Sequence, residues 1–142
     1  MRHGDALANP SSDFERLLSP LGADQAAEAG AAIKHYRVDV QHVFFSPLPR
    51  AKSTAEIVAA AVNPHLSASA WQELAPGADC EIVASKLGFE GGALIVTHQP
   101  FASRMVFYLT GEEVEMSTGT VACIQAESLK PLQCELKWLA PE

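Results

Sequence analysis

Apolar side chains recur along the chain at the spacing that is typical of helices. Within residues 24–36, alanine, isoleucine and tyrosine follow an i, i+3, i+4, i+7 pattern, which places them on one helix face. A second stripe of alanine and valine follows Arg50 and ends at Asn63-Pro64, a pair that stops helices. The pattern predicts helices over residues 24–36, 50–62, 81–87 and 101–109.

Shorter apolar runs predict strands between these helices. The runs near residues 42–45 and 92–97 are unbroken, as in strands that are buried on both faces. Two further strands are predicted over 120–127 and 133–139, and in the second one Cys134, Leu136 and Trp138 alternate with polar residues. Residues 5–22 are polar and contain proline and serine, so they are expected to form a loop.

The alternation of strands with helices predicts an α/β fold. Because the central strands are apolar throughout, we expect a three-layer sandwich with a largely parallel central sheet and an antiparallel edge. The chain has 142 residues, of which 48% are hydrophobic and 19% charged, so one globular domain over 1–142 is expected.

The charge balance excludes some classes of partner. A formal net charge of −7 argues against nucleic acid and anionic membrane surfaces, which require a basic field. The sequence contains no run long enough to cross a membrane and no signal peptide at its start, so the cytoplasm is the expected location.

Cysteine and histidine spacing predicts no metal and no other cofactor. The three cysteines, at 80, 123 and 134, form no Cys-x-x-Cys pair, and the five histidines lack the spacing of a zinc site. Free thiols are favoured, although Cys123 and Cys134 could face each other across a hairpin.

Three short segments carry residues suited to phosphoryl chemistry: Arg2-His3-Gly4, Ser46 to Ala51, and Thr97 to Pro100. Guanidinium forks bind phosphate oxygens bidentately, and a neutral imidazole can attack phosphorus. Arg50 and His98 each follow a predicted parallel strand, and ligands of such sheets bind at the carboxyl ends of the strands. These segments therefore predict a phosphate site at that edge.

These motifs, in this order, resemble the histidine phosphatase superfamily, and most closely its small SixA-type phosphohistidine phosphatases. The matching segments are Arg-His-Gly-Asp-Ala at the start, the loop 12–19 followed by Gly22, Ser-Pro-Leu-Pro-Arg-Ala followed by Thr54-Ala55-Glu56, residues 72–77, and Thr-His-Gln-Pro. The resemblance implies a phosphoglycerate mutase-like sandwich in its small form, without a cap subdomain. It also implies a shallow site, which suits a phosphohistidine displayed on a protein surface.

The resemblance further implies roles for individual residues. His3 would form a phosphohistidine enzyme intermediate, and Arg2, Arg50 and His98 would bind the phosphoryl oxygens. Glu73 is the first candidate for the proton donor, since the mutase branch of the family has its donor in a similar segment. Asp13 is the second candidate for the proton donor. Both Asp13 and Arg16 could also contact the substrate, and Arg16 could equally be solvated surface.

One feature departs from the family pattern. Family members carry a short apolar strand immediately before Arg-His-Gly, whereas only Met1 precedes it here. We therefore expect a domain that lacks this first strand, or a start assigned at an internal methionine. Residues near a free terminus are usually mobile unless they are tied down.

Three functions are compatible with these observations. The first is a metal-independent phosphatase that acts on a phosphohistidine-bearing phosphotransfer protein and releases inorganic phosphate. The second is a small-molecule phosphomonoesterase of the same fold. The third is a phosphate-binding module without turnover, which the departure at Met1 would favour.

Overall fold

The computed structural model describes residues 1–8, 11–88 and 91–141. Its strands form two sheets, one parallel in the order β2-β1-β3 and one antiparallel pair β4-β5. The strands are β1 (Val40–Phe45), β2 (Ala68–Ala70), β3 (Gly92–Val96), β4 (Val121–Gln125) and β5 (Glu135–Ala140).

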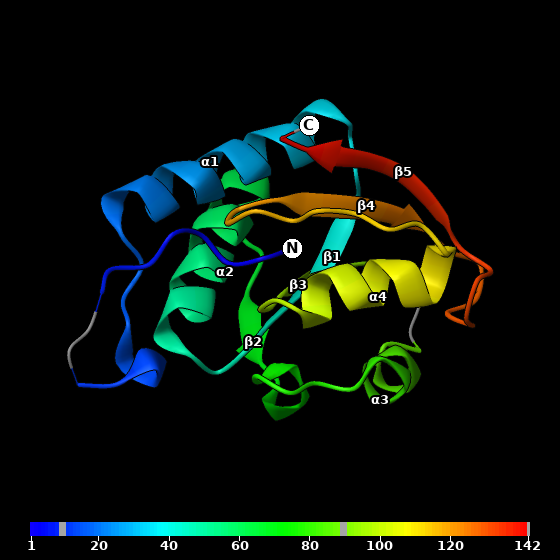
Figure 1. The fold of residues 1–142 in the computed structure, drawn as a ribbon. Helices are drawn as coiled ribbons and strands as arrows, with labels where there is room; N and C mark the ends of the chain where they lie inside the picture. Colours follow the sequence, from blue (N-terminus) through cyan, green and yellow to red (C-terminus); the bar gives the residue numbers. More distant parts are fainter. Residues whose placement is uncertain (9–10, 89–90, 142) are drawn as a thin grey trace.

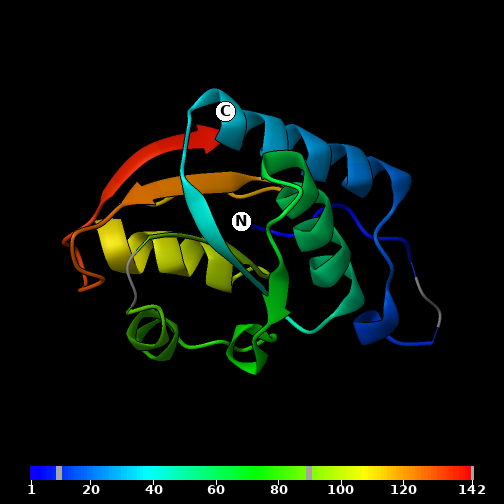
Figure 2. The same ribbon diagram turned by 180° about the vertical axis from the view of Figure 1, so that it is seen from behind.

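Helices cover both faces of the parallel sheet (Figures 1 and 2). Val43 and Val96 point to the face covered by the first two helices, while Phe44 and Ile95 point to the face covered by the last two. Adjacent strand residues thus bury opposite faces, as the unbroken apolar runs predict. The helices are α1 (Pro20–His35), α2 (Pro49–Val62), α3 (Cys80–Lys86) and α4 (Phe101–Thr110), with 3-10 turns η1 (Asp13–Glu15) and η2 (Gln72–Leu74).

The first three residues lie between the two sheets. Met1 accepts a hydrogen bond from the Thr97 amide at 3.0 Å, and the His3 amide donates to the Thr97 carbonyl at 3.0 Å. On the other side, the Arg2 amide donates to the Thr120 carbonyl at 3.0 Å. Met1–His3 is therefore a short strand-like segment that joins the parallel sheet to the approach to β4.

A cleft extends from Met1 between β3 and β4. It has a volume of about 1070 Å³, and its lining is largely apolar, including Ile95, Met105 and Ile124. The Met1 amino group lies at its end, donates to the Ile95 carbonyl at 2.9 Å, and has its pKa lowered to about 5 by burial. The terminus is thus tied down, in a position where a strand backbone N–H would stand.

The expected α/β sandwich with an antiparallel edge is confirmed, with differences in its elements. The helix expected from residue 24 begins at Pro20, because Ser19 caps it by accepting from the Gly22 amide and proline is favoured in the first turn. The prediction of a loop over 5–22 is wrong at its end, where α1 begins, and this stretch also contains the short turn η1. Strand β2, with the sequence Ala-Ser-Ala, was not predicted, since it has no apolar run.

Two further observations bear on the sequence-based expectations. The three cysteines are free thiols, so the alternative of a Cys123–Cys134 bridge is wrong. Among the described residues, no helix is both long and apolar enough to cross a membrane.

Candidate active site

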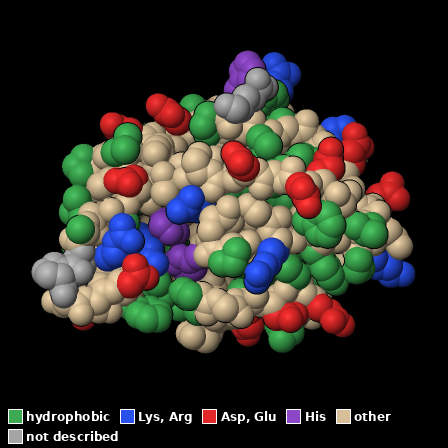
Figure 3. Space-filling model, in the orientation of Figure 1, with side chains coloured by type: hydrophobic (Ala, Val, Ile, Leu, Met, Phe, Trp, Pro, Cys, Tyr) green, Lys and Arg blue, Asp and Glu red, His purple; other side chains and the backbone are tan. Residues whose placement is uncertain are grey.

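The fold brings four predicted residues to one edge of the parallel sheet. His98 follows the end of β3 after Thr97, and Arg50 lies in the first turn of α2 after β1. Arg2 and His3 run beside the end of β3. The carboxyl ends of parallel strands share an edge, and ligands bind there. Figure 3 shows histidine side chains gathered with basic side chains on one face of the molecule.

His3 is held as a neutral imidazole with a defined tautomer. Its Nδ1 lies 2.7 Å from the Gly4 carbonyl oxygen, which can only accept, so Nδ1 carries the proton. Its Nε2 accepts from Arg50 Nε at 3.3 Å. Burial, followed by the positive charges of Arg50, Arg2 and Arg16, lowers the pKa of His3 to about 4 although the Gly4 bond opposes this. Nε2 is therefore unprotonated at neutral pH, and its electron pair accepts the hydrogen bond from Arg50 Nε.

His98 stands next to His3, with ring centroids 5.1 Å apart at 60°. Its Nε2 lies 2.6 Å from Ser46 Oγ, and burial is the main cause that lowers its pKa to about 4. Its Nδ1 is buried and has no hydrogen-bond partner within the described part of the chain. A polar atom of this kind is costly to leave unpaired, so it is suited to meeting a ligand.

Both arginines at the centre of the site are built into the fold. Arg50 is buried, and all three of its guanidinium nitrogens are hydrogen-bonded, one of them to His3. Arg2 donates from Nη1 to the Met116 carbonyl at 3.1 Å, while its Nε is buried with no partner among the residues described. Guanidinium groups held in this way are placed to meet the equatorial oxygens of a phosphoryl group, although Arg50 must then share or exchange its contacts with Asp13.

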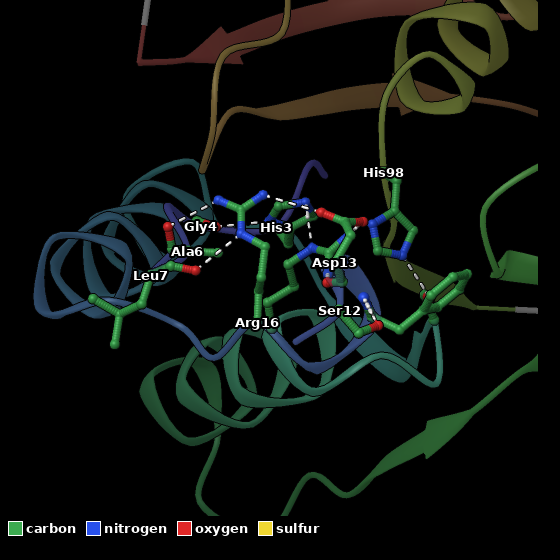
Figure 4. Close-up of polar contacts among 11 residues, drawn as sticks. His3, Gly4, Ala6, Leu7, Ser12, Asp13, Arg16 and His98 are labelled. Carbon is green, nitrogen blue, oxygen red and sulfur yellow. Dashed lines mark hydrogen bonds and ion pairs between the residues drawn. The ribbon is translucent and has the colours of Figure 1, made fainter. Parts of the chain in front are cut away.

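Asp13 binds the two terminal nitrogens of the Arg50 guanidinium group. Its carbonyl accepts from Arg50 Nη1 at 2.7 Å, and its carboxylate oxygen Oδ2 lies 3.2 Å from Arg50 Nη2. Arg16 Nη1 donates to the other carboxylate oxygen at 3.2 Å (Figure 4). Hydrogen bonding from Arg16 and then the charge of Arg50 lower the pKa of Asp13, so the group is a carboxylate at neutral pH. In this state it binds Arg50 as an anion, and its role as the second candidate for the proton donor stays a prediction.

Replacing Asp13 with asparagine is therefore expected to tighten the binding of inorganic phosphate. The amide keeps the shape of the side chain but removes the exposed negative charge that competes for Arg50, so a gain of up to about fivefold in affinity is expected. Isothermal titration calorimetry measures the dissociation constant. Glu15→Gln removes a charge from the same 3-10 turn and is the control. Weaker phosphate binding in Asp13→Asn would show that the carboxylate supports the ligand instead.

Glu73 lies in η2 and pairs with a lysine. Lys86 Nζ donates to Glu73 Oε2 at 2.8 Å, and this bond is the main cause that lowers the pKa of Glu73. The turn itself is anchored to the site, because Thr97 Oγ1 donates to the Leu74 carbonyl at 3.1 Å. No described contact joins the Glu73 side chain to His3, so its role as proton donor stays a prediction.

Two positioning residues had no predicted role. Thr54 Oγ1 accepts from the Gly4 amide at 3.0 Å and donates to the Arg50 carbonyl at 2.7 Å, so it links the segment of His3 to α2. Its i, i+4 spacing from Arg50 is the signal that could have identified it. A Cβ atom on Gly4 would lie 2.5 Å from the Gly22 carbonyl oxygen, which explains why glycine follows His3.

The depressed histidine pKa values predict how stability depends on pH. Native His3 and His98 bind a proton only near pH 4, whereas the unfolded chain binds it near 6.5. Since the unfolded state then holds more protons, the free energy of unfolding should fall as pH drops from about 6.5 to about 4. The buried Met1 amine acts in the same direction between pH 8 and 5.

Urea unfolding at pH 7 and pH 5 measures this difference. His98→Gln should lose less stability between the two pH values than the parent chain, because one titrating group is gone. His65→Gln, at an exposed position, is the control and should match the parent. An equal loss in His98→Gln and the parent would contradict the assignment.

The described residues contain no group of three His, Cys, Asp or Glu side chains that could hold a metal ion. The chemistry that this arrangement can support rests on a neutral imidazole surrounded by guanidinium groups. Such a set can attack a phosphoryl group and stabilise the charge that develops on its oxygens.

Comparison with known proteins finds similar chains in sequence and in structure. The chain is 35% identical over 131 residues to the phosphohistidine phosphatase SixA of Escherichia coli K12, covering 87% of this chain and 81% of that protein. The solved structure of the protein histidine phosphatase SixA complexed with tungstate superposes with a TM-score of 0.86 at 29% identity, covering 98% and 92% of the two chains. A phosphoserine phosphatase of Entamoeba histolytica complexed with 3-phosphoglyceric acid shares the fold, with a TM-score of 0.68 at 14% identity over 97% and 93%.

A family model gives the broader assignment. The model of the histidine phosphatase superfamily (branch 1) matches residues 1–81, which include His3, Arg50 and the loop that carries Asp13. Together with the 35% identity to a protein matched over most of its length, this match shows that the chain belongs to the histidine phosphatase superfamily.

Proposed function

We propose that this chain is a phosphohistidine phosphatase that acts on a phosphohistidine-bearing protein through a phosphoryl intermediate on His3. The observation that carries the proposal is the state of His3. Its Nδ1 is protonated and bonded to Gly4, and its Nε2 is an electron pair donor beside Arg50. This is the form of histidine that can act as a nucleophile.

The reaction has two displacement steps. In the first, the His3 Nε2 electron pair forms a bond to phosphorus, the phosphorus–nitrogen bond of the substrate breaks, and the substrate imidazole leaves and takes up a proton. In the second, water attacks phosphorus, the bond to His3 breaks, and inorganic phosphate is released. The attacking water gives one proton to solvent, which balances the proton that the leaving imidazole takes from solvent in the first step. Arg2, Arg50 and His98 would bind the phosphoryl oxygens, and losing one such donor typically costs about 3–4 kcal/mol in the barrier.

The choice of substrate class rests on similarity and on the leaving group. Two relatives that match most of the chain carry the name SixA, one described as a phosphohistidine phosphatase and the other as a protein histidine phosphatase. The two candidate acids, Asp13 and Glu73, both have lowered pKa values. An imidazole leaving group needs little help from an acid, unlike the alkoxide of an ordinary phosphate ester, so a phosphohistidine suits this site better.

The test offers the protein two substrates side by side. One is a protein phosphorylated on histidine, and the other is a generic aryl phosphate. We expect a much larger kcat/KM for the phosphohistidine protein. Preference for the aryl phosphate would favour the small-molecule phosphomonoesterase. Binding of phosphate without turnover of either substrate would favour the non-catalytic module.

A further inference from the structure

Exposed apolar side chains gather in one segment beside the site. Eight large apolar side chains are exposed among the described residues, and half of them belong to the fifteen positions from 7 to 21. Phe14 is 60% exposed and Leu17 is 58% exposed. The four are Leu7, Phe14, Leu17 and Leu21, and we call them the apolar rim. Exposed apolar groups that cluster in this way mark interaction sites more often than scattered ones do.

The apolar rim is continuous with the phosphate site. Phe14 directly follows Asp13, whose carbonyl and carboxylate both contact Arg50. Leu17 directly follows Arg16, whose guanidinium contacts the same carboxylate. In Figure 3, hydrophobic side chains border the basic and histidine side chains at that margin of the molecule. A macromolecule whose phosphoryl group reaches His3 comes close to the segment that carries Phe14 and Leu17.

Hydrogen bonds hold the rim in a fixed shape. The Leu7 amide donates to the Leu17 carbonyl at 2.8 Å, and Arg16 Nε donates back to the Leu7 carbonyl at 2.9 Å. Arg16 Nη2 also donates to the Ala6 carbonyl at 3.0 Å, as Figure 4 shows. The Phe14 amide donates to Ser12 Oγ at 3.1 Å, which fixes the start of η1. A surface that is already ordered loses less entropy when it binds a partner.

The charge of the chain explains why apolar contact is needed. Its net charge of −7 opposes the approach of a phosphorylated partner, except at the local cluster of arginines. Apolar contact is not opposed by that charge and can supply affinity around the small basic centre. The rim thus fits a partner with a phosphohistidine encircled by apolar side chains.

We infer that the apolar rim is the docking surface for the phosphohistidine-bearing protein. The rim contributes to the binding of protein substrates and does not contribute to the binding of free phosphohistidine. The inference rests on the proposed function. It adds that recognition of the protein is separate from the chemistry, because Phe14 and Leu17 border the site without supplying a polar group to it.

The experiment compares a protein substrate with the same phosphorus–nitrogen bond in a small molecule. The double variant Phe14→Ser, Leu17→Ser is assayed on a histidine-phosphorylated protein and on the free amino acid phosphohistidine. The matched control is Ile82→Ser, Phe107→Ser, since these side chains are 56% and 48% exposed and lie on α3 and α4. Thermal melting by circular dichroism checks that each variant is folded.

The rim variant should lose about tenfold or more in kcat/KM on the protein substrate, mainly through a higher KM, since two large apolar contacts are removed. On free phosphohistidine it should match the parent, and the control variant should match the parent on both substrates. Leu7→Ser, Leu21→Ser should give the same selective loss, because these two exposed residues complete the apolar rim.

Two results would overturn the inference. An unchanged kcat/KM of the rim variant on the protein substrate would show that the rim does not dock it. An equal loss on both substrates would show that these side chains support the site itself. Failure of the parent chain to hydrolyse either phosphohistidine substrate is a separate result, because it removes the proposed function and the docking partner with it.

Discussion

Replacement of His3 with alanine is expected to abolish turnover while phosphate still binds measurably. The nucleophile is lost, and removal of a covalent nucleophile costs on the order of 10⁴ to 10⁶ in kcat in other enzymes. Arg2, Arg50 and His98 remain to hold the anion, and Arg50 loses only the contact at 3.3 Å. Steady-state kinetics on the phosphohistidine protein and calorimetry with inorganic phosphate measure the two effects.

A matched control separates this effect from a general disturbance. His65 is exposed and lies outside the site, so His65→Ala should retain the activity of the parent. Rapid alkali quenching of the parent chain during turnover should trap a phosphorylated intermediate, and later treatment of the quenched sample with acid should hydrolyse it. Retained turnover in purified His3→Ala, or an intermediate with the opposite stability, would contradict covalent catalysis at His3.

Adding about five apolar residues before Met1 is expected to raise thermal stability and activity together. The cleft between β3 and β4 continues the line of Met1–His3, and apolar side chains of both sheets and α4 line it. Each large apolar side chain that becomes fully buried contributes about 1.5–3 kcal/mol, so two of them should raise the melting temperature by roughly 10 °C.

Activity should rise for a second reason. The added segment replaces the buried Met1 amine by an amide and pairs with β3, so it holds His3 more firmly at the end of a strand. A misplacement of about 1 Å can cost on the order of a hundredfold in rate. Better pairing should also reduce self-association through the edges of β3 and β4.

The comparison needs three forms of the chain: the parent, an extension of five valine, isoleucine or leucine residues, and an extension of five glycine or serine residues. Melting temperature, molar mass by light scattering and turnover are measured for each. Equal values for the apolar and the polar extension would show that the cleft does not accept a strand.

Local pattern predicted the parts of the fold whose burial is regular. Strand β3 and helix α2 follow from an unbroken apolar run and a 3.6-residue stripe, and both were found within one or two residues. Strand β2 lacked any such signal, because Ala68–Ala70 forms only through pairing with β1. The start of α1 at Pro20 was missed because Ser19 and Pro20 resemble a turn as much as a helix cap.

The site residues likewise divide into those that local sequence predicts and those that depend on contacts between distant segments. His3, Arg50 and His98 could be predicted because each is placed by a strand end and a motif. The contact of Asp13 with Arg50 joins residues 37 positions apart through a loop, and no periodicity encodes it. The tautomer of His3 depends on the Gly4 carbonyl at 2.7 Å, which only the folded backbone defines.

The buried amino terminus has a practical consequence for anyone who purifies this protein. An affinity tag fused directly to Met1 must leave through the cleft, so its last few residues become part of the interior rather than a neutral handle. Preparations that differ only in those residues are then different proteins in melting behaviour and rate. Kinetic constants from tagged and cleaved samples can be compared only when the residues in front of Met1 are the same.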